Sequence, residues 1–273
     1  MPEQPGTIDN YMKEYCVLDW SADDSVSPEE AHIISEYRIL VEVEGQPAMT
    51  IMCTPGDDED LVVGRLFTEG FIDGMDELES LTFTKLSDDS VVAHVTLATR
   101  AAELVETPVM DVPRVGAGSQ VLRRFADRTS REDFLTKGEL HPWLPGTVFA
   151  AAEHFAQDSP LHRMTSGAHS CYMMQDGRLI HRAEDIGRHN TVDKVIGWAL
   201  RNGVDMTKTC VFISGRIPTD MIVKAIRAKF GIFATKKMPT RQAIDMARRY
   251  HVTLVCDVDK GHLKVFSGMQ PLG

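Results

Sequence analysis

The chain has 273 residues, 43% of them hydrophobic and 25% charged, which indicates a globular protein of one large or two ordinary domains. Its formal net charge of −11 disfavours nucleic acid and anionic membrane surfaces as bulk partners. No apolar run is long enough to cross a membrane, and residues 1–15 lack the apolar segment of a secretory signal.

The first 110 residues predict a polar lead-in followed by a small α+β domain. Residues 1–35 are expected to be loosely held, because residues 11–30 stay polar and acidic. Alternating β-rich runs then predict two hairpins, and an amphipathic segment between them predicts a helix. The strands are expected at 36–43, 47–53, 81–86 and 91–97, and the helix at 58–69. We therefore expect an N-terminal α+β domain over residues 36–110.

Residues 111–146 are expected to form a long loop. The segment has many charges and little hydrophobic periodicity, and it contains Gly116, Gly118, Pro142, Pro145 and Gly146. A structureless stretch of this length in a compact protein is usually functional or mobile.

Residues 147–273 predict an α/β domain. A helix at 147–156 precedes a hairpin of residues 170–174 and 178–181, and strands then alternate with helices. The later strands are expected at 209–214, 232–235 and 252–257, and the helices between them at 218–229 and 240–250. Strands separated by helices of about ten residues indicate βαβ units and a parallel sheet.

The segment 183–194, with the sequence AEDIGRHNTVDK, is the most informative part of the chain. It runs into an amphipathic helix that Asn190 or Thr191 is expected to cap. The unpaired N–H groups of a helix start, together with donors from Arg188 and His189, suit an anion or a polar ligand. The spacing leaves open the alternative of a helix-capping loop with solvated charges.

Strand ends give a second indication of an anion site. Ligands of parallel sheets bind beyond the carboxyl ends of the strands, and these ends carry Ser214-Gly215-Arg216, Lys236-Lys237 and residues 257–262. An arginine beside a glycine suits phosphate, because the guanidinium binds two oxygens and the glycine lets the ligand approach. The alternative is a set of ordinary polar loops.

The cysteines indicate neither a disulfide framework nor a metal site. They are odd in number and widely spaced, at Cys16, Cys53, Cys171, Cys210 and Cys256, which favours a reducing cytoplasm. Cys210 and Cys256 lie in apolar runs and are expected in the core, and Cys53 is expected to be partly exposed. The zinc-deaminase motifs are absent, and His169 with Cys171 offers only two ligands, so no metal ligand is expected.

Four motifs resemble the FdhD family of formate dehydrogenase accessory proteins, and the resemblance covers about residues 36–268. The motifs are Thr54-Pro55-Gly56-Asp57 with Asp60, Leu61, Gly64, Glu69 and Gly70; Thr165-Ser166-Gly167-Ala168-His169; Glu184-Asp185-Ile186-Gly187-Arg188-His189-Asn190 with Asp193 and Lys194; and Ser214-Gly215-Arg216 with Met221, Lys224 and Ala225.

The resemblance implies a sulfur carrier, or sulfurtransferase. Members of that family pass sulfur, as a cysteine persulfide, from a cysteine desulfurase to the molybdenum bis(guanine dinucleotide) cofactor, which is then inserted into formate dehydrogenase. The resemblance also implies a cytidine-deaminase-like C-terminal domain, a homodimer, and cofactor binding through the loop after the last strand.

Site residues follow from these two lines of reasoning together. The residues expected to bind the cofactor are Arg188, His189, Ser214, Arg216, Asp257, Val258, Asp259, Lys260, Gly261 and His262. The residues expected to organise the site loop are His169, Glu184, Asp185, Asp193 and Lys194. The three carboxylates among them are expected to do this rather than to act as acid or base.

The sequence departs from the family pattern in two places. The C-x-x-C pair of the family's long loop is absent, and its two positions fall near Arg131 and Phe134, neither of which forms a persulfide. Cys171 is the substitute thiol nearest to the signature loop in sequence. The last loop, with Asp257 and Asp259, is more acidic than the family's usual run. A cofactor-binding chaperone without sulfur transfer, and an unrelated small-molecule enzyme on the same fold, are therefore the alternative functions.

Overall fold

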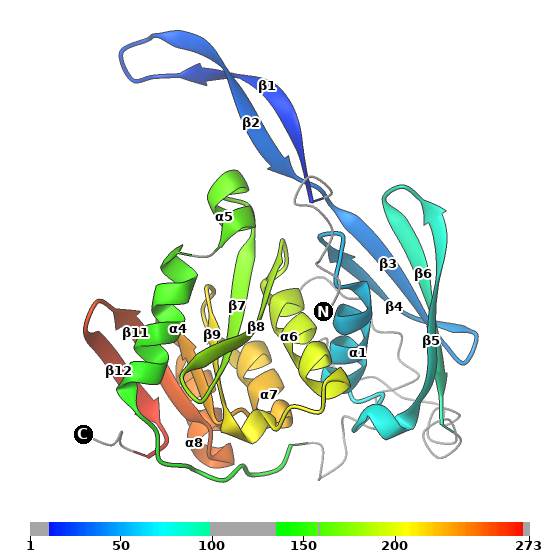
Figure 1. Ribbon diagram of the computed structural model, residues 1–273, viewed down its shortest axis with the longest axis vertical. Coiled ribbons are helices and arrows are strands. Elements are labelled where there is room, and N and C mark those ends of the chain that lie inside the picture. Colours follow the sequence, from blue (N-terminus) through cyan, green and yellow to red (C-terminus); the bar gives the residue numbers. More distant parts are fainter. Residues whose placement is uncertain (1–10, 99–134, 158, 270–273) are drawn as a thin grey trace.

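A six-stranded mixed sheet organises the C-terminal part of the protein, in the strand order β12-β11-β10-β9-β7-β8 (Figure 1). The structure is a computed structural model that describes residues 11–98, 135–157 and 159–269. The strands of this sheet are β7 (His169–Gln175), β8 (Arg178–Asp185), β9 (Thr209–Ile213), β10 (Ile232–Thr235), β11 (Thr253–Asp259) and β12 (His262–Ser267).

The expected βαβ units are present in the middle of this sheet. Strands β9, β10 and β11 run parallel, and α7 (Thr219–Ala228) and α8 (Arg241–Tyr250) connect them. Strand β7 runs antiparallel to both β9 and β8, and β12 runs antiparallel to β11. The expected parallel sheet is therefore confirmed for three strands, while the hairpins on both sides make the complete sheet mixed.

Both faces of the sheet are buried, which explains why its strands read as continuous apolar runs. Successive residues of β7 point to opposite faces, so that Cys171 and Met173 join one core cluster and Tyr172 and Met174 join the other. Helices α6 (Arg188–Arg201), α7 and α8 contribute to the first cluster, and α4 (Pro145–Gln157) contributes to the second.

The N-terminal lobe is a four-stranded sheet with the order β4-β3-β6-β5, packed against helix α1. Its elements are β3 (Tyr37–Val43), β4 (Gln46–Cys53), α1 (Asp58–Thr68), a 3-10 turn η2 (Met75–Glu77), β5 (Leu78–Ser87) and β6 (Ser90–Leu97). These elements agree with the expected pair of hairpins and the helix. Strands β3 and β6 pair in parallel, which joins the two hairpins into one sheet.

Helices α1 and α6 cross at a pair of glycines and join the two lobes. A β-carbon on Gly64 would overlap the carbonyl oxygen of Asp193, and a β-carbon on Gly197 would overlap that of Asp60. Only glycine therefore lets the two backbones approach this closely. The apolar residues of both lobes form one continuous core cluster as a result.

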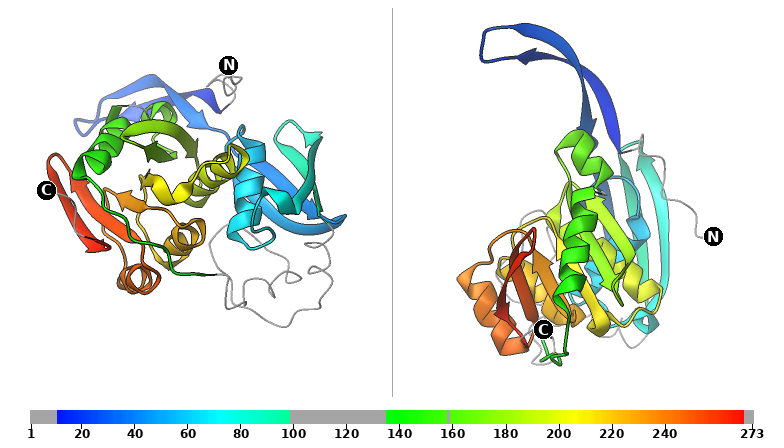
Figure 2. Two further views of the ribbon diagram at one scale, coloured as in Figure 1. Left: turned by 60° about the horizontal axis from the view of Figure 1, so that its bottom comes forward. Right: turned by 60° about the vertical axis from the view of Figure 1, so that its left-hand side comes forward.

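Residues 12–34 form a hairpin that projects from the body, with β1 (Met12–Trp20) paired antiparallel to β2 (Val26–Ile34) (Figures 1 and 2). We call this hairpin the arm. Part of the expected polar lead-in is therefore a regular hairpin, which the sequence did not indicate because exposed apolar residues lie on both of its faces and produce no alternation. The turn is held by Ser21, whose backbone N–H donates to the carbonyl of Ser25, and by Asp23, whose carboxylate accepts from the Ser25 hydroxyl.

Two further expectations need correction, and two short elements were not predicted. Helix α6 begins at Arg188 with Gly187 as its N-cap, because the side chain of Asn190 is used elsewhere. Residues 257–262 are not a loop after the last strand, since they form the end of β11 and the turn into β12. A short helix, α5 (Pro160–Thr165), also precedes β7, and a 3-10 turn, η4 (Met206–Lys208), precedes β9.

Most of the expected long loop, including Arg131 and Phe134, lies outside the described residues. Residues 135–144 of that loop form neither helix nor strand. In the described ranges, no helix combines the length and the apolar character needed to span a membrane.

Candidate functional site

One edge of the main sheet collects the polar residues that the sequence singled out. Because β7 is antiparallel to β9, its first residue, His169, lies at the same edge as the carboxyl ends of β8 and β9. His169 pairs in register with Asp185, the last residue of β8. Ser214 follows β9 directly, and Lys236 follows β10. We call this the carboxyl edge.

At the centre of the carboxyl edge, Gly215 is surrounded by polar side chains. The Ser214 hydroxyl accepts a hydrogen bond from the Ser170 amide at 3.0 Å and lies 3.2 Å from His169 Nδ1. A β-carbon on Gly215 would lie 3.6 Å from Cβ and Cδ of Arg188 and 4.0 Å from His169 Nδ1. The structure therefore brings together Arg188, His169 and Ser214, and Arg216 is exposed beside them.

His169 lies here as a neutral group. Burial, followed by the charge of Arg188, lowers the pKa of its ring. Its side chain therefore contributes a hydrogen-bonding ring at neutral pH, while Arg188 and Arg216 contribute the positive charge.

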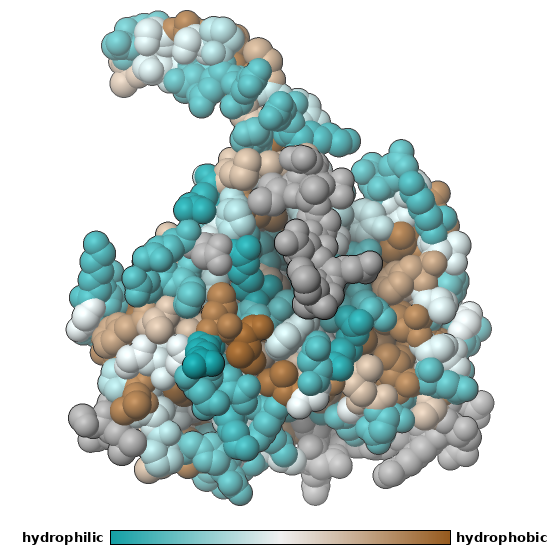
Figure 3. All heavy atoms as spheres, in the orientation of Figure 1, coloured by the Kyte–Doolittle hydropathy of each residue, from teal (hydrophilic) through white to brown (hydrophobic). Residues whose placement is uncertain are grey.

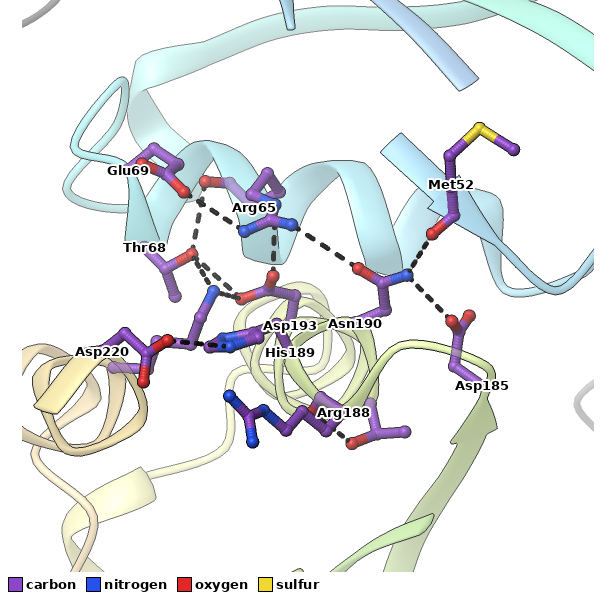
Figure 4. Close-up of polar contacts among 12 residues, drawn as sticks. Met52, Arg65, Thr68, Glu69, Asp185, Arg188, His189, Asn190, Asp193 and Asp220 are labelled. Atoms are coloured by element: carbon purple, nitrogen blue, oxygen red, sulfur yellow. Dashed lines mark hydrogen bonds and ion pairs between the residues drawn. The ribbon is translucent and has the colours of Figure 1, made fainter. Parts of the chain in front are cut away.

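His189 has a different position from its neighbour Arg188. It is buried, and its Nε2 lies 3.1 Å from a carboxylate oxygen of Asp220 at the start of α7 (Figure 4). The hydrogen bond from His189 lowers the pKa of Asp220. Sequence reasoning missed Asp220, because it lies in a separate helix with no spacing that links it to His189.

The Asp185–Lys194 pair is fully buried and ties the signature loop to the N-terminal lobe. Lys194 Nζ lies 3.0 Å from Asp185 Oδ2, which also accepts from the amide and the hydroxyl of Thr54, both at 3.1 Å. The other carboxylate oxygen accepts from Gly187 N and Asn190 Nδ2, both at 2.8 Å, and Figure 4 shows the contact with Asn190. Burial alone would lower the pKa of Lys194, but the carboxylates of Asp185 and Asp57 outweigh it and raise that pKa.

Asp193, the residue before Lys194 in α6, forms a second buried cluster. Its carboxylate lies 2.6 Å from Lys224 Nζ and 3.3 Å from Arg65 Nε, and it accepts from the Thr68 hydroxyl at 2.9 Å (Figure 4). Burial alone would raise the pKa of Asp193, but the two cations lower it. The cluster therefore links α1, α6 and α7 around the Asp193 carboxylate.

Glu184 supports the start of α5 next to the carboxyl edge. Its carboxylate accepts from the backbone amides of Leu161 and His162 at 3.1 and 3.0 Å, and from the Ser170 hydroxyl at 3.3 Å. Glu184, Asp185 and Asp193 thus all make framework contacts. Their role in organising the loop, rather than in proton transfer, stays a prediction, and these framework contacts support it.

The last hairpin contributes less to a binding surface than the sequence indicated. Val258 is buried in the second core cluster, so its side chain faces the interior. The Asp257 carboxylate lies 2.7 Å from Lys264 Nζ and 3.7 Å from His262 Nε2. Asp259, Lys260 and Gly261 are exposed at the turn.

Four of the five cysteines are buried, and none forms a disulfide. Cys210 and Cys256 lie in the core as expected, and burial raises the pKa of each thiol to about 12. Cys53 is buried with a raised pKa, so its expected exposure was wrong. Burial also raises the pKa of Cys171, which removes it as an accessible substitute thiol. Cys16, on the arm, is exposed.

Metal ligation has no clear candidate in the part of the chain that the structure describes. There, no group of three or more His, Cys, Asp or Glu residues has the arrangement to hold a metal ion.

Comparison with known proteins finds similarity over almost the whole chain. Residues 34–272 match the model of the FdhD/NarQ family. A protein of Listeria monocytogenes serotype 4b named Sulfur carrier protein FdhD is 28% identical over 251 residues, covering 88% of this chain and 91% of its own length. A protein of the same name from Anaeromyxobacter dehalogenans is 32% identical over 253 residues, covering 87% of each chain.

A solved structure shows the same fold. It is a protein from Desulfotalea psychrophila described as a candidate formate dehydrogenase accessory protein, with a TM-score of 0.73 and 20% identity over 94% of this chain and 97% of that one. The family match and the coverage of these relatives lead to one conclusion. This chain belongs to the FdhD/NarQ family.

Proposed function

We propose that this protein is a sulfur carrier that serves formate dehydrogenase and holds the molybdenum bis(guanine dinucleotide) cofactor as cargo at the carboxyl edge. The names of its relatives support the carrier role and the accessory role. The observation that carries the binding site is Gly215, flanked by Arg188, Ser214 and the exposed Arg216. A cysteine desulfurase is the proposed sulfur donor.

The carboxyl edge suits the phosphates of a nucleotide-bearing cargo. The guanidinium groups of Arg188 and Arg216, which lie on either side of the buried Gly215, can supply charge-assisted hydrogen bonds to phosphate oxygens. The Ser214 hydroxyl is fixed by the Ser170 amide and lies beside the neutral ring of His169. These donors can bind the phosphates of the ligand directly, so the proposed site includes no protein ligand to a metal ion.

His189 is buried against Asp220, and we propose that it supports the cofactor site through this pair. The exposed turn at Asp259, Lys260, Gly261 and His262 is proposed to contact the cofactor with its outer surface. Asp257 and Val258 are proposed only as backbone neighbours, because the Asp257 carboxylate pairs with Lys264 and the Val258 side chain is in the core. The centre of the proposed cofactor site is therefore formed by Arg188, Ser214 and Arg216.

Sulfur transfer requires an accessible thiolate. In such a step, the acceptor thiolate attacks the outer sulfur of the donor's cysteine persulfide, a new S–S bond forms, and the donor leaves as a thiolate as its own S–S bond breaks. Since Cys53, Cys171, Cys210 and Cys256 are buried, Cys16 is the cysteine of this chain that meets the requirement of exposure.

The second candidate function is a cofactor-binding chaperone without sulfur transfer. The observation in its favour is that burial raises the pKa of four of the five thiols. The two functions separate when the protein is incubated with a cysteine desulfurase and ³⁵S-labelled cysteine and the bound sulfur is mapped by mass spectrometry. Label on Cys16 that Cys16→Ser removes supports the carrier. Absence of label from every cysteine contradicts the carrier and supports the chaperone.

Three further assignments, of fold, compartment and oligomeric state, complete the proposal. The C-terminal sheet, with its three parallel strands, supports the cytidine-deaminase-like fold that the family resemblance implies. Five free cysteines support a reducing compartment, the cytoplasm. We also propose a homodimer, because the arm exposes apolar surface of the kind that marks protein–protein contacts.

A further inference from the structure

The arm exposes large apolar side chains on both of its faces. Opposite residues of an antiparallel pair share a face. By this register, Leu18, Trp20 and Val26 lie together on one face, and Tyr15, Val17 and Ile33 lie on the other. All six side chains are exposed, Leu18 to 74% and Trp20 to 69%. Figure 3 shows the arm projecting at the top of the molecule, with a few hydrophobic residues among mostly hydrophilic ones. Apolar residues gathered on a projecting segment are typical of an interaction surface.

The body of the chain contacts the arm at its base, and the outer part of the arm lacks such contacts among the described residues. An isolated two-stranded hairpin is at best marginally stable in water. Within the described residues, β2 contacts α5, and Ile34 lies near Gly167. Beyond this base the arm extends away from the body in Figure 1 and in the right-hand view of Figure 2. A cover over the outer part would therefore stabilise it.

Charge selects what can cover the arm. Between residues 12 and 34 the only cation among Lys and Arg is Lys13, against the carboxylates of Glu14, Asp19, Asp23, Asp24, Glu29 and Glu30. A second arm would bring like charges together, which is unfavourable. The complementary surface is basic, and the chain presents one at its carboxyl edge. Its cations there are Arg163, Arg188, Arg216, Lys236 and Lys237, of which Arg163, Arg216 and Lys237 are exposed.

We propose that the arm of one copy of this chain docks on the carboxyl edge of a second copy, each copy giving one arm and receiving one. This reciprocal contact has the two-fold symmetry of most homodimers. The arm, residues 12–34, is about as long as one side of a standard interface, which takes roughly 20–30 residues. The partner's arm would then form the outer wall of each candidate site, so that a complete site needs two chains.

The inference rests on the homodimer proposed above but not on the identity of the cargo, and its first test is the oligomeric state of the full chain. Sedimentation velocity between about 1 and 100 μM is expected to show a dimer. The double variant Leu18→Asp with Trp20→Asp is expected to raise the dimer dissociation constant at least tenfold. Leu86→Asp, at an exposed leucine of β5 in the N-terminal lobe, is the matched control and should leave the dimer intact.

Each outcome of that experiment bears on a separate statement. A wild-type chain that stays monomeric contradicts both the homodimer and the docking. A dimer that persists in the double variant contradicts the docking and leaves the homodimer standing. Unchanged thermal unfolding of the body shows that the variant's effect is not a loss of folding.

The second test locates the arm. A photo-reactive residue at position 20, in a mixture of ¹⁴N- and ¹⁵N-labelled chains, should cross-link to residues 160–169, 214–216 or 236–237 of the other copy. Links to another arm or within one chain contradict the proposal. Cys16 offers an independent readout, because it is exposed while the other four cysteines are buried. Its alkylation should slow several-fold as the dimer forms, and a rate independent of concentration would also contradict the proposal.

Discussion

The carboxylate of Asp185 accepts hydrogen bonds from both the backbone amide and the hydroxyl of Thr54, a contact between residues 131 positions apart that is buried from solvent. Asp185 also pairs with Lys194, so one carboxylate fixes the signature loop, the start of α6 and the N-terminal lobe together. Asp185 therefore supports the site through the framework around it.

Asp185→Asn is expected to lower stability and ligand binding together. The substitution leaves the buried ammonium of Lys194 without its main counter-charge, and breaking such a buried pair costs about 3–5 kcal/mol. Chemical denaturation and calorimetry with GDP measure the two effects. The control is Asp205→Asn, which removes an exposed ion pair with Lys208 and should change stability by less than about 1 kcal/mol. Normal stability with lost ligand binding would instead indicate direct contact with the ligand.

Gly64→Ala and Gly197→Ala are each expected to separate the two lobes. Each added methyl would overlap a backbone carbonyl across the α1–α6 crossing, and overpacking of this kind costs about 1–3 kcal/mol or more. Thermal unfolding of the two variants measures the loss. Gly146→Ala is the matched control, since its β-carbon would meet open space within the first turn of α4. Equal stability of all three variants would contradict the close crossing.

The fold was predictable where the pattern of one segment decides the structure. The strand Ile232–Thr235 was predicted with its observed bounds, and the helix at Arg241–Tyr250 differs only by its cap, Thr240. The arm was missed because its apolar residues lie on both faces, Tyr15 and Val17 on one and Leu18 and Trp20 on the other. A hairpin without a covered face leaves no hydrophobic period to detect.

The site was predictable as an edge but not as a set of contacts. Strand-end reasoning placed Ser214 and Arg216 at one rim, and the structure adds His169 to it through the antiparallel β7. Side-chain partners from separate elements, such as Asp220 for His189, depend on tertiary packing that spacing does not encode. For the same reason, the sequence did not reveal that Cys53 is buried.

Acid is expected to destabilise the protein partly through His181. This ring stacks on Trp198 with centroids 4.3 Å apart, and burial lowers its pKa to about 4. Because the folded pKa lies below the unfolded value of about 6.5, the contribution is fully present above pH 6.5 and is lost as the pH falls toward 4. The loss is on the order of 2–3 kcal/mol.

His181→Phe keeps a stacking ring and removes the titration. Denaturation between pH 7 and 4 should therefore show a smaller loss of stability for His181→Phe than for the wild type, with His141→Phe, at an exposed histidine, as the control. A variant that loses as much stability as the wild type over this range would show that His181 is not responsible.

The most direct test of the binding site is calorimetric titration with GDP, which carries the guanine and diphosphate of the proposed cargo. Arg216→Ala is expected to weaken GDP binding about tenfold or more, because a charge-assisted hydrogen bond contributes about 1.5–3 kcal/mol. Arg178→Ala, at an exposed arginine at the opposite end of β8, should bind as tightly as the wild type. An unchanged affinity in Arg216→Ala would contradict the placement of the ligand at the carboxyl edge.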